Sequence, residues 1–135
     1  MDIQTFQNVA SKLPSEMAIL MRGPTGVGKS FLAKAVAEEK SLPFLDVRLS
    51  TMSEGDVGGY PDMEGMKETG VMTFCMPSWF MRACQEPVVL CLDELNRALI
   101  GVQQSAFQLI LDRSSATTRT VFHTPFTLIL GSSLV

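Results

Sequence analysis

One short segment near the N-terminus restricts the fold of this chain more than any other. Residues 23–30 read Gly-Pro-Thr-Gly-Val-Gly-Lys-Ser. They match the pattern G-x-x-x-x-G-K-[ST], in which a glycine-rich turn joins a strand to a helix and wraps around phosphate groups. The flanking residues agree with this pattern, because a short apolar run at 17–21 precedes the turn and a helical pattern at 30–40 follows it. The segment therefore predicts a phosphate-binding loop.

Each residue type in this loop has a chemical reason. Glycines let backbone N–H groups approach an anion without a Cβ in the way, and a helix starting near Lys29 directs its positive end toward the phosphates. Lys29 adds a full charge beside the β- and γ-phosphates, and the Ser30 hydroxyl suits Mg²⁺. The alternative is an ordinary glycine-rich connection between a strand and a helix. The candidate nucleotide-binding residues are Gly23, Pro24, Thr25, Gly26, Val27, Gly28, Lys29, Ser30 and Phe31.

A second apolar run, residues 88–92, ends in two carboxylates, Asp93 and Glu94, as in a Walker B motif. If the two strands are neighbours in one parallel sheet, their carboxyl ends meet where open α/β sheets bind ligands. We therefore expect Asp93 to hold Mg²⁺ through its water shell. We expect Glu94 to orient and polarise an attacking water as a catalytic residue, together with Lys29. Alone, such a run is more often a solvated strand end, and the phosphate-binding loop upstream is what favours hydrolysis.

Apolar runs that alternate with helical patterns predict an α/β fold, with a mostly parallel sheet between two layers of helices. A length of 135 residues suits a single domain, residues 1–135, with a core of its own. The expected strands are residues 17–21, 43–49, 88–92 and 126–130, and the expected helices are residues 2–13, 30–40, 78–84 and 96–113. Asp2 and Ser78 are the expected caps of the first and third helices. Residues 50–70 and 114–120 are expected to be irregular.

Composition argues against several classes of protein. The chain has 11 basic and 14 acidic residues, so we do not expect a nucleic-acid-binding module. No apolar run reaches the roughly 18 residues of a membrane span, and the N-terminus lacks a signal-peptide pattern. The cysteines Cys75, Cys84 and Cys91 form no C-x-x-C pair, which favours buried free thiols in a reducing, cytoplasmic setting over a metal or redox site. The single His123 makes a histidine-based metal site or catalytic triad hard to build.

Together the two motifs resemble those of the AAA+ ATPases, a group within the P-loop NTPases. Residues 92–98, LDELNRA in one-letter code, are similar to the DE[IL]NRA stretch of the MoxR-like members of that group. The following helix and residues 56–61, DVGGYP, which are similar to the D-[LV]-x-G loop of those members, support the subfamily more loosely. The resemblance covers about residues 15–113.

This resemblance implies a three-layer α/β/α core that binds ATP or ADP and hydrolyses ATP with Mg²⁺. It also implies a ring, usually a homo-oligomer of six subunits, that remodels partner proteins or inserts cofactors into them. Such partners often carry a von Willebrand factor A domain. In a ring of this kind Arg97 would contact a neighbouring subunit or a substrate; alternatively, it is a surface arginine on the first turn of a helix.

The resemblance fades after Arg113. MoxR-like proteins carry a sensor asparagine at the end of the next strand, and Ser133 is its nearest counterpart here, with Ser132 as the alternative. The sequence ends at Val135, before the arginine finger, the fifth core strand and the C-terminal helical lid of the family. We therefore expect a core without the lid and with very slow turnover. A truncated core, a gene with an altered 3′ end, or a divergent member that borrows these parts would each explain this, and we favour the first.

Two other functions stay open at this point. A small P-loop kinase would use the same loop, but the position of Glu94 beside Asp93, far from the loop in sequence, favours water activation over transfer to an acceptor. A fragment that binds nucleotide, or only its partners, would show little or no turnover.

Residues 50–70 are a candidate surface for partners. Tyr60, Met63 and Met66 would form an adaptable apolar grip, or the segment is a mobile surface loop or a small hairpin. Trp79 and Phe80 are expected to pack beneath the sheet.

Overall fold

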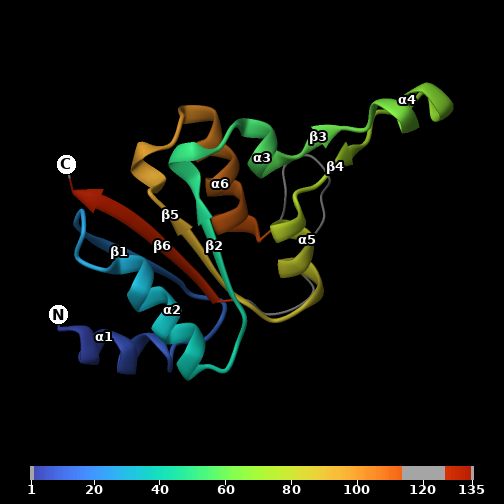
Figure 1. Ribbon diagram of the computed structural model, residues 1–135. Coiled ribbons are helices and arrows are strands. Elements are labelled where there is room, and N and C mark those ends of the chain that lie inside the picture. The colour runs from blue at the N-terminus through green and yellow to red at the C-terminus, as the bar shows by residue number, and fades with distance from the viewer. Residues whose placement is uncertain (1, 114–126, 135) are drawn as a thin grey trace.

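The computed structural model describes residues 2–113 and 127–134, except for the side chains of 133 and 134. Four strands form one sheet in which every pairing is parallel. They are β1 (Ala18–Pro24), β2 (Phe44–Arg48), β5 (Val89–Asp93) and β6 (Thr127–Leu134), in the order β1-β6-β5-β2 across the sheet (Figure 1). The predicted α/β fold with a mostly parallel sheet is confirmed, and the predicted strands match β1, β2, β5 and the first part of β6.

The strand order differs from the simplest expectation in one respect. Strand β6 lies between β1, which leads into the glycine-rich turn, and β5, which ends in Asp93. The two motif-bearing strands are therefore not direct neighbours. Their carboxyl ends still lie at the same edge, because β6 runs parallel to both and pairs Met21 with Gly131 on one side and Leu92 with Leu130 on the other.

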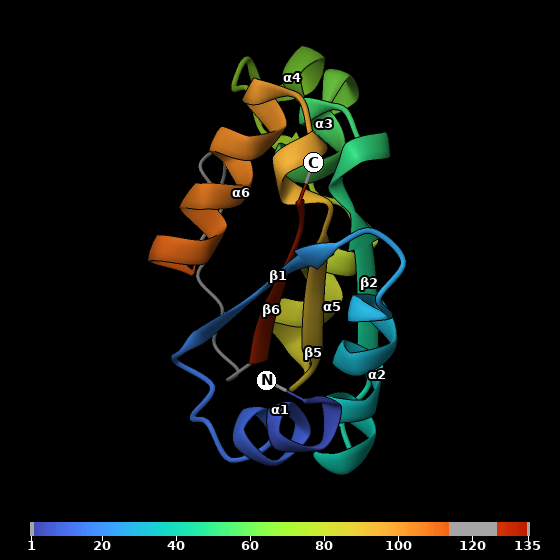
Figure 2. The same cartoon turned by 90° about the vertical axis from the view of Figure 1, so that its left-hand side faces the viewer.

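Helices α1 (Ile3–Ala10) and α2 (Lys29–Glu39) cover one face of the sheet (Figure 2). Small residues on these helices let the helices lie close to the strands. The helices and the sheet together bury one apolar layer. This layer contains Ala10, Met21, Ala33, Val36, Ala37, Val89, Cys91 and Ile129. Asp2 caps α1 as predicted, since its carboxylate accepts the Thr5 N–H at 2.7 Å. The helix ends at Ala10, three residues before the predicted boundary.

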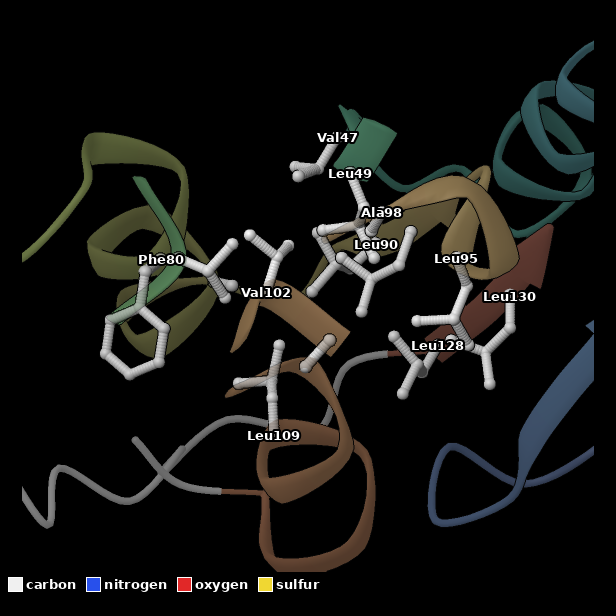
Figure 3. Packing of buried hydrophobic residues seen from close by; sticks show 14 of the residues in the cluster. Val47, Leu49, Phe80, Leu90, Leu95, Ala98, Val102, Leu109, Leu128 and Leu130 are labelled. Carbon is white, nitrogen blue, oxygen red and sulfur yellow. The ribbon is translucent and has the colours of Figure 1, made fainter. Parts of the chain in front are cut away.

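Helices α3 (Glu54–Gly58), α5 (Ser78–Gln85) and α6 (Ile100–Asp112) contribute to the core on the other face. Figure 3 shows Leu90 and Leu128 of the sheet together with Phe80 of α5 and Val102 of α6 in this layer. Full burial of each such side chain contributes about 1.5–3 kcal/mol. Phe80 is buried and Trp79 packs against the same layer, as predicted; the Trp79 indole also donates to the Asp56 carbonyl.

Two helix starts differ from the predicted ones. The helix expected from residue 96 begins at Ile100, because a short 3₁₀ turn, η2 (Leu95–Arg97), comes first. Glu94 precedes that turn with a left-handed backbone, φ 57°, which turns the chain sharply at the end of β5. Ser78 is the first residue of α5 and not its cap, since Pro77 occupies the cap position without a side-chain hydrogen bond.

The segment predicted to be irregular contains ordered elements, so that prediction was wrong. A 3₁₀ turn, η1 (Leu49–Thr51), and α3 are followed by β3 (Tyr60–Pro61), α4 (Met63–Thr69) and β4 (Phe74–Cys75). The two short strands pair as a hairpin with α4 at its tip, and residues 60–75, here called the arm, project away from the sheet (Figure 1). The small-hairpin alternative is therefore the one that the structure bears out.

The cysteines follow the prediction only in part. All three are free; Cys84 and Cys91 are buried, whereas Cys75 is exposed on the arm because β4 has only β3 beside it. Burial, followed by the charges of Asp46 and Asp93, raises the pKa of the Cys91 thiol to about 12, which keeps it protonated and unsuited to metal binding. His123 lies outside the described residues. Within the described part of the chain, no helix is both long and apolar enough to cross a membrane.

Candidate nucleotide-binding site

The glycine-rich turn forms where β1 ends and α2 begins. Gly26 and Gly28 have φ angles of 84° and 83°, and Gly28 is the N-cap of α2. This left-handed backbone is accessible to glycine at little cost, and no side-chain cap bonds the first turn of α2. The free N–H groups at the start of α2 therefore face the turn together with its positive dipole end. The turn therefore offers backbone N–H groups to an anion.

Lys29 bends back over this turn. Its ammonium group donates to the carbonyl of Gly23 at 3.1 Å and to that of Pro24 at 2.8 Å. Carbonyl oxygens are neutral acceptors, so a phosphate oxygen brought into the turn would be a stronger partner for the same ammonium. The side chain is thus held at the loop, close to where an anion would bind.

Ser30 and Asp93 meet across the sheet edge, as the sequence predicted for a shared metal site. The Ser30 hydroxyl donates to Asp93 Oδ2 at 2.5 Å, and the Glu94 N–H donates to Asp93 Oδ1 at 2.8 Å. Asp93 is only 7% exposed. Both side chains offer hard oxygen atoms, the donor type that Mg²⁺ prefers. Among the described residues there is no cluster of three or more carboxylate, histidine or cysteine side chains that could hold a metal ion.

Gly131 makes this arrangement possible, and its role was not predicted from the sequence. It lies on β6, between the two motif strands. A Cβ there would come within 3.0 Å of Asp93 Cγ and 3.3 Å of Asp93 Cα. The carboxylate therefore occupies space that only a glycine at 131 leaves open.

Glu94 follows Asp93 at the mouth of the same cleft. It is partly buried, and its carboxylate accepts a hydrogen bond from the hydroxyl of Ser50, just beyond β2. Its left-handed backbone is uncommon for a residue with a side chain and turns the carboxylate out of the strand direction. The sequence pattern identified Glu94, but its contact with Ser50 depends on β2 lying beside β5 and was not predicted.

A cleft of about 310 Å³ joins these groups. Its lining contains Thr25, Gly26, Gly28, Lys29, Ser30, Phe31, Arg48, Asp93 and Glu94. Phe31 is 71% exposed at the rim. Arg48 is a lining residue that sequence reasoning missed, because nothing in the pattern around β2 marks it as different from a solvated strand end.

A second cleft, of about 420 Å³, adjoins the first at Lys29. It lies between α1, β1 and the start of α2. Its lining includes Val27, the one residue of 25–28 that does not line the first cleft. Its lining is largely apolar and comprises Asp2, Ile3, Phe6, Leu20, Met21, Arg22, Val27, Lys29 and Leu32. Gly23 and Pro24 are the last two residues of β1 and are not among the residues that line either cleft.

Arg97 and Ser133 were predicted with less specific roles. The Arg97 guanidinium donates to the Thr25 hydroxyl at 3.2 Å, so within one chain it contacts the phosphate-binding turn. Ser133 lies in β6 opposite Gly23, at the same edge of the sheet, and Ser132 lies opposite Arg22. The side chain of Ser133 is outside what the structure describes, so its sensor role stays a prediction.

Comparisons with known proteins agree with this geometry. The family model described as "AAA domain (dynein-related subfamily)" matches residues 18–129. The ATP-dependent zinc metalloprotease FtsH of Haemophilus influenzae is 44% identical over 57 residues, which are 42% of this chain and 9% of FtsH. A YME1 homologue from Schistosoma mansoni, also an ATP-dependent zinc metalloprotease, is 44% identical over 55 residues, 41% of this chain and 8% of that protein. The chain thus spans less than a tenth of the length of these curated relatives.

Two solved structures share the fold. NtrX of Brucella abortus in complex with ADP has a TM-score of 0.67 and 21% identity, over 98% of this chain and 28% of NtrX. The Holliday junction branch migration motor RuvB of Thermotoga maritima has a TM-score of 0.57 and 20% identity, over 96% of this chain and 37% of RuvB. At such identities the likeness concerns the fold alone, whereas the family match extends over most of the sequence. The chain therefore belongs to the AAA domain family, in its dynein-related subfamily.

Proposed function

We propose that the chain binds ATP with Mg²⁺ in the cleft between the glycine-rich turn and Asp93, and that it hydrolyses the terminal phosphate bond. One observation carries the proposal: the hydroxyl of Ser30 and the carboxylate of Asp93 lie 2.5 Å apart beside a turn whose amides are free to bind an anion. Membership of the AAA domain family supports ATP as the ligand.

Different residues of the cleft would bind different parts of the nucleotide. Residues 23–28 and the first turn of α2 offer amides to the phosphates, and Lys29 exchanges its two carbonyl partners for phosphate oxygens. Ser30 and Asp93 would hold Mg²⁺, which when bound neutralises charge on the phosphates. The apolar cleft beside Lys29, with Phe6 and Leu32 in its lining, would take the base of the nucleotide.

Glu94 is the proposed base that orients and polarises the attacking water. Its carboxylate is hydrogen-bonded to Ser50, so it must leave or share that hydroxyl to act on a water at the terminal phosphate. This contact favours a second candidate, a nucleotide-binding module with little turnover in the isolated chain. An ATP-consuming kinase would require an acceptor molecule in place of that water.

We further propose a MoxR-like role: a cytoplasmic ring, of six subunits in the most common case, that remodels client proteins, some with a von Willebrand factor A domain. In that ring Arg97 would contact a neighbouring subunit near the nucleotide. The arm supports client contact, since Tyr60 and Met63 are exposed on it. Nucleic acid is not the proposed partner, given the acidic balance of the chain.

Two substitutions test the enzymatic proposal. Lys29→Ala should abolish Mg-ATP binding measured by calorimetry, because it removes the cation held at the turn. Glu94→Gln should leave binding intact and lower phosphate release by about 100-fold or more, because the amide is not a base. Lys34→Ala, an exposed lysine further along α2, is the matched control and should behave as wild type.

The outcomes separate the candidates. Binding by Lys29→Ala at wild-type affinity would contradict the loop assignment. Unchanged phosphate release in Glu94→Gln would contradict the role of Glu94. The mass of the wild-type chain in the presence of Mg-ATP shows whether it is a monomer or an assembly. In either state, stoichiometric binding of ATP without phosphate release would support the binding module. ATP consumption that appears only with a small acceptor would support a kinase.

A further inference from the structure

Arg48 ends strand β2 at the side of the cleft opposite the glycine-rich turn. It is the register partner of Asp93 on β5, and partners on adjacent parallel strands project to the same face of a sheet. That face is the one covered by α2, from which Ser30 reaches Asp93. Arg48 and the proposed metal-binding pair therefore belong to one side of the sheet and to one cleft.

Carboxylates lie near Arg48, but none of the residues that the structure describes forms a hydrogen bond with its guanidinium. Among the described residues, the guanidinium makes no ion pair within 4.0 Å, and only the main-chain carbonyl of Arg48 takes part in a side-chain hydrogen bond, with Thr51. Its electrostatic neighbour is Asp46 on the same strand: burial and then the charge of Asp93 raise the pKa of the Asp46 carboxyl, and the charge of Arg48 opposes this. The arginine is thus close enough to Asp46 to influence its carboxyl group without an ion pair between them.

The other two cations at the cleft differ from Arg48. Lys29 is bound to two loop carbonyls, and Arg97 is bound to the Thr25 hydroxyl. Both contact the turn on the β1 side, where the proposed site would hold the first phosphates. Arg48 approaches from the β2 side, across β5, next to Asp93 and Glu94. If a chain of phosphates begins at the turn, its terminal phosphate is the one that would extend toward those two acids and β2.

From this position we infer that Arg48 binds the terminal phosphate of the nucleotide, within the same chain, and makes the cleft select triphosphates over diphosphates. The inference rests on the proposed nucleotide site and deepens it. A guanidinium can donate two parallel hydrogen bonds to one phosphate, which a lysine cannot. The added positive charge also offsets the two carboxylates, Asp93 and Glu94, that would otherwise repel the terminal phosphate.

A purely structural role for Arg48 predicts a different result. If the guanidinium only screens Asp46 and Asp93, its loss would disturb the cleft for every nucleotide alike, and the free protein would lose stability. If the guanidinium contacts the terminal phosphate, its loss weakens the binding of a triphosphate and leaves the affinity for a diphosphate nearly unchanged. The ratio of the two affinities is therefore the informative quantity.

The experiment measures the affinity of the 135-residue chain for Mg-ADP and for the non-hydrolysable triphosphate Mg-AMP-PNP by calorimetry. In Arg48→Ala the AMP-PNP affinity should fall about 10-fold or more, as for loss of a charge-assisted hydrogen bond, and the ADP affinity should change less than about 2-fold. Arg48→Lys should lie between wild type and Arg48→Ala, because it keeps the charge but not the paired donors. Arg82→Ala, on the far helix α5, is the control and should leave both affinities unchanged.

Each outcome decides the inference. If Arg48→Ala bound both nucleotides equally more weakly, or bound AMP-PNP as tightly as wild type, the inference about Arg48 would be overturned. The proposed nucleotide site itself would still stand. Arg48 is exposed, so the variant should fold, and its circular dichroism is compared with that of wild type. If Arg48→Ala does not fold, an unchanged affinity ratio in Arg48→Gln overturns the inference equally. Failure of the wild-type chain to bind either nucleotide would instead overturn the proposed function and this inference together.

Discussion

The cleft end of the sheet and the arm are built in opposite ways. At the cleft, strands β1, β6 and β5 end side by side, and the functional groups come from residues far apart in sequence, such as Ser30 and Asp93. The arm has two strands of two residues each, and its helix α4 contains no buried residue. Its order comes from neighbours in the chain: Asp62 caps α4 through the Gly65 N–H, and Gly70 ends it.

This structural difference suits the two regions to different functions. Phosphate chemistry needs groups fixed to within a fraction of an ångström, and the buried strands provide that fixation. A surface for varied protein partners benefits from exposed, adaptable side chains instead, and the arm presents Met63, Val71 and Met72. If the contrast holds, a change that displaces the fixed groups of the cleft should weaken nucleotide binding, whereas a change at the arm should leave nucleotide binding at the wild-type value.

The largest effect should come from Gly131→Ala. The new methyl group would displace Asp93, breaking its hydrogen bonds with the Ser30 hydroxyl and the Glu94 N–H. We expect unfolding in urea to show a loss of about 1–3 kcal/mol, typical of overpacking. We expect Mg-ATP affinity to fall about 10-fold or more through loss of charge-assisted contacts.

Gly70→Ala on the arm is the matched control. Gly70 has a φ of 70° with no atom within 4 Å of the position of a Cβ, so alanine meets backbone strain but no neighbour. Stability should fall by about 1–2 kcal/mol, and Mg-ATP affinity should stay at the wild-type value. Wild-type affinity in Gly131→Ala, or weakened affinity in Gly70→Ala, would contradict the contrast between the two regions.

Much of the cleft was predictable from the sequence because its signals are local. Residues 23–30 form one continuous turn, and Asp93 and Glu94 directly end an apolar strand. The parallel arrangement then brings both groups to one edge without any knowledge of strand order. The contacts of Arg48, Ser50 and Gly131 were missed because they depend on β2 lying beside β5 and on β6 lying between β5 and β1.

The arm illustrates the reverse failure. Signals for order were present in the sequence: Asp62 and Gly70 delimit the short helix of the arm, and just before the arm Ser53 and Asp56 have the spacing of a capping box at the start of α3. Glycine content alone suggested an irregular loop. The exposure of Cys75 was missed for a related reason, since free cysteines are most often buried and nothing local marks a two-stranded hairpin outside the core.

A pair of carboxylates should give opposite pH effects. Burial, and then the charge of Asp93, raise the pKa of Asp46 above its ordinary value of 3.8. The folded protein therefore binds the proton of the Asp46 carboxyl more tightly than the unfolded chain does. The contribution of this group to stability falls as the pH rises from 3.8 through the higher pKa of the folded state. Asp46→Asn should raise the melting temperature at pH near 7, and the gain should shrink as pH falls toward the ordinary value.

Asp56 of α3, which accepts a hydrogen bond from the Tyr60 hydroxyl of the arm, should show the opposite dependence of stability on pH. Hydrogen bonds from the backbone and side chain of Ser53, with a further one from Tyr60, lower its pKa below 3.8. Its contribution to stability is present above that value and is lost as pH falls through the lower folded pKa. Asp56→Asn should lower the melting temperature at pH near 7, with the difference disappearing in acid. Shifts of the same sign in both variants would contradict this assignment.

The smallest effect should come from the apolar surface of the arm. Met63 and Met72 are 55% and 58% exposed, so replacing both with serine removes little buried area. The double variant Met63→Ser with Met72→Ser should change the free energy of unfolding by no more than about 0.5 kcal/mol, the usual range for surface positions, and should bind Mg-ATP like wild type. Leu90→Ala, at a fully buried position in β5, is the contrasting control and should lose about 2–5 kcal/mol. If instead the double variant lost more than about 1 kcal/mol, beyond that surface range, these two side chains would contribute to packing rather than form an adaptable surface. The division between a fixed cleft and an adaptable surface would then have to be abandoned, because the same packing would constrain both.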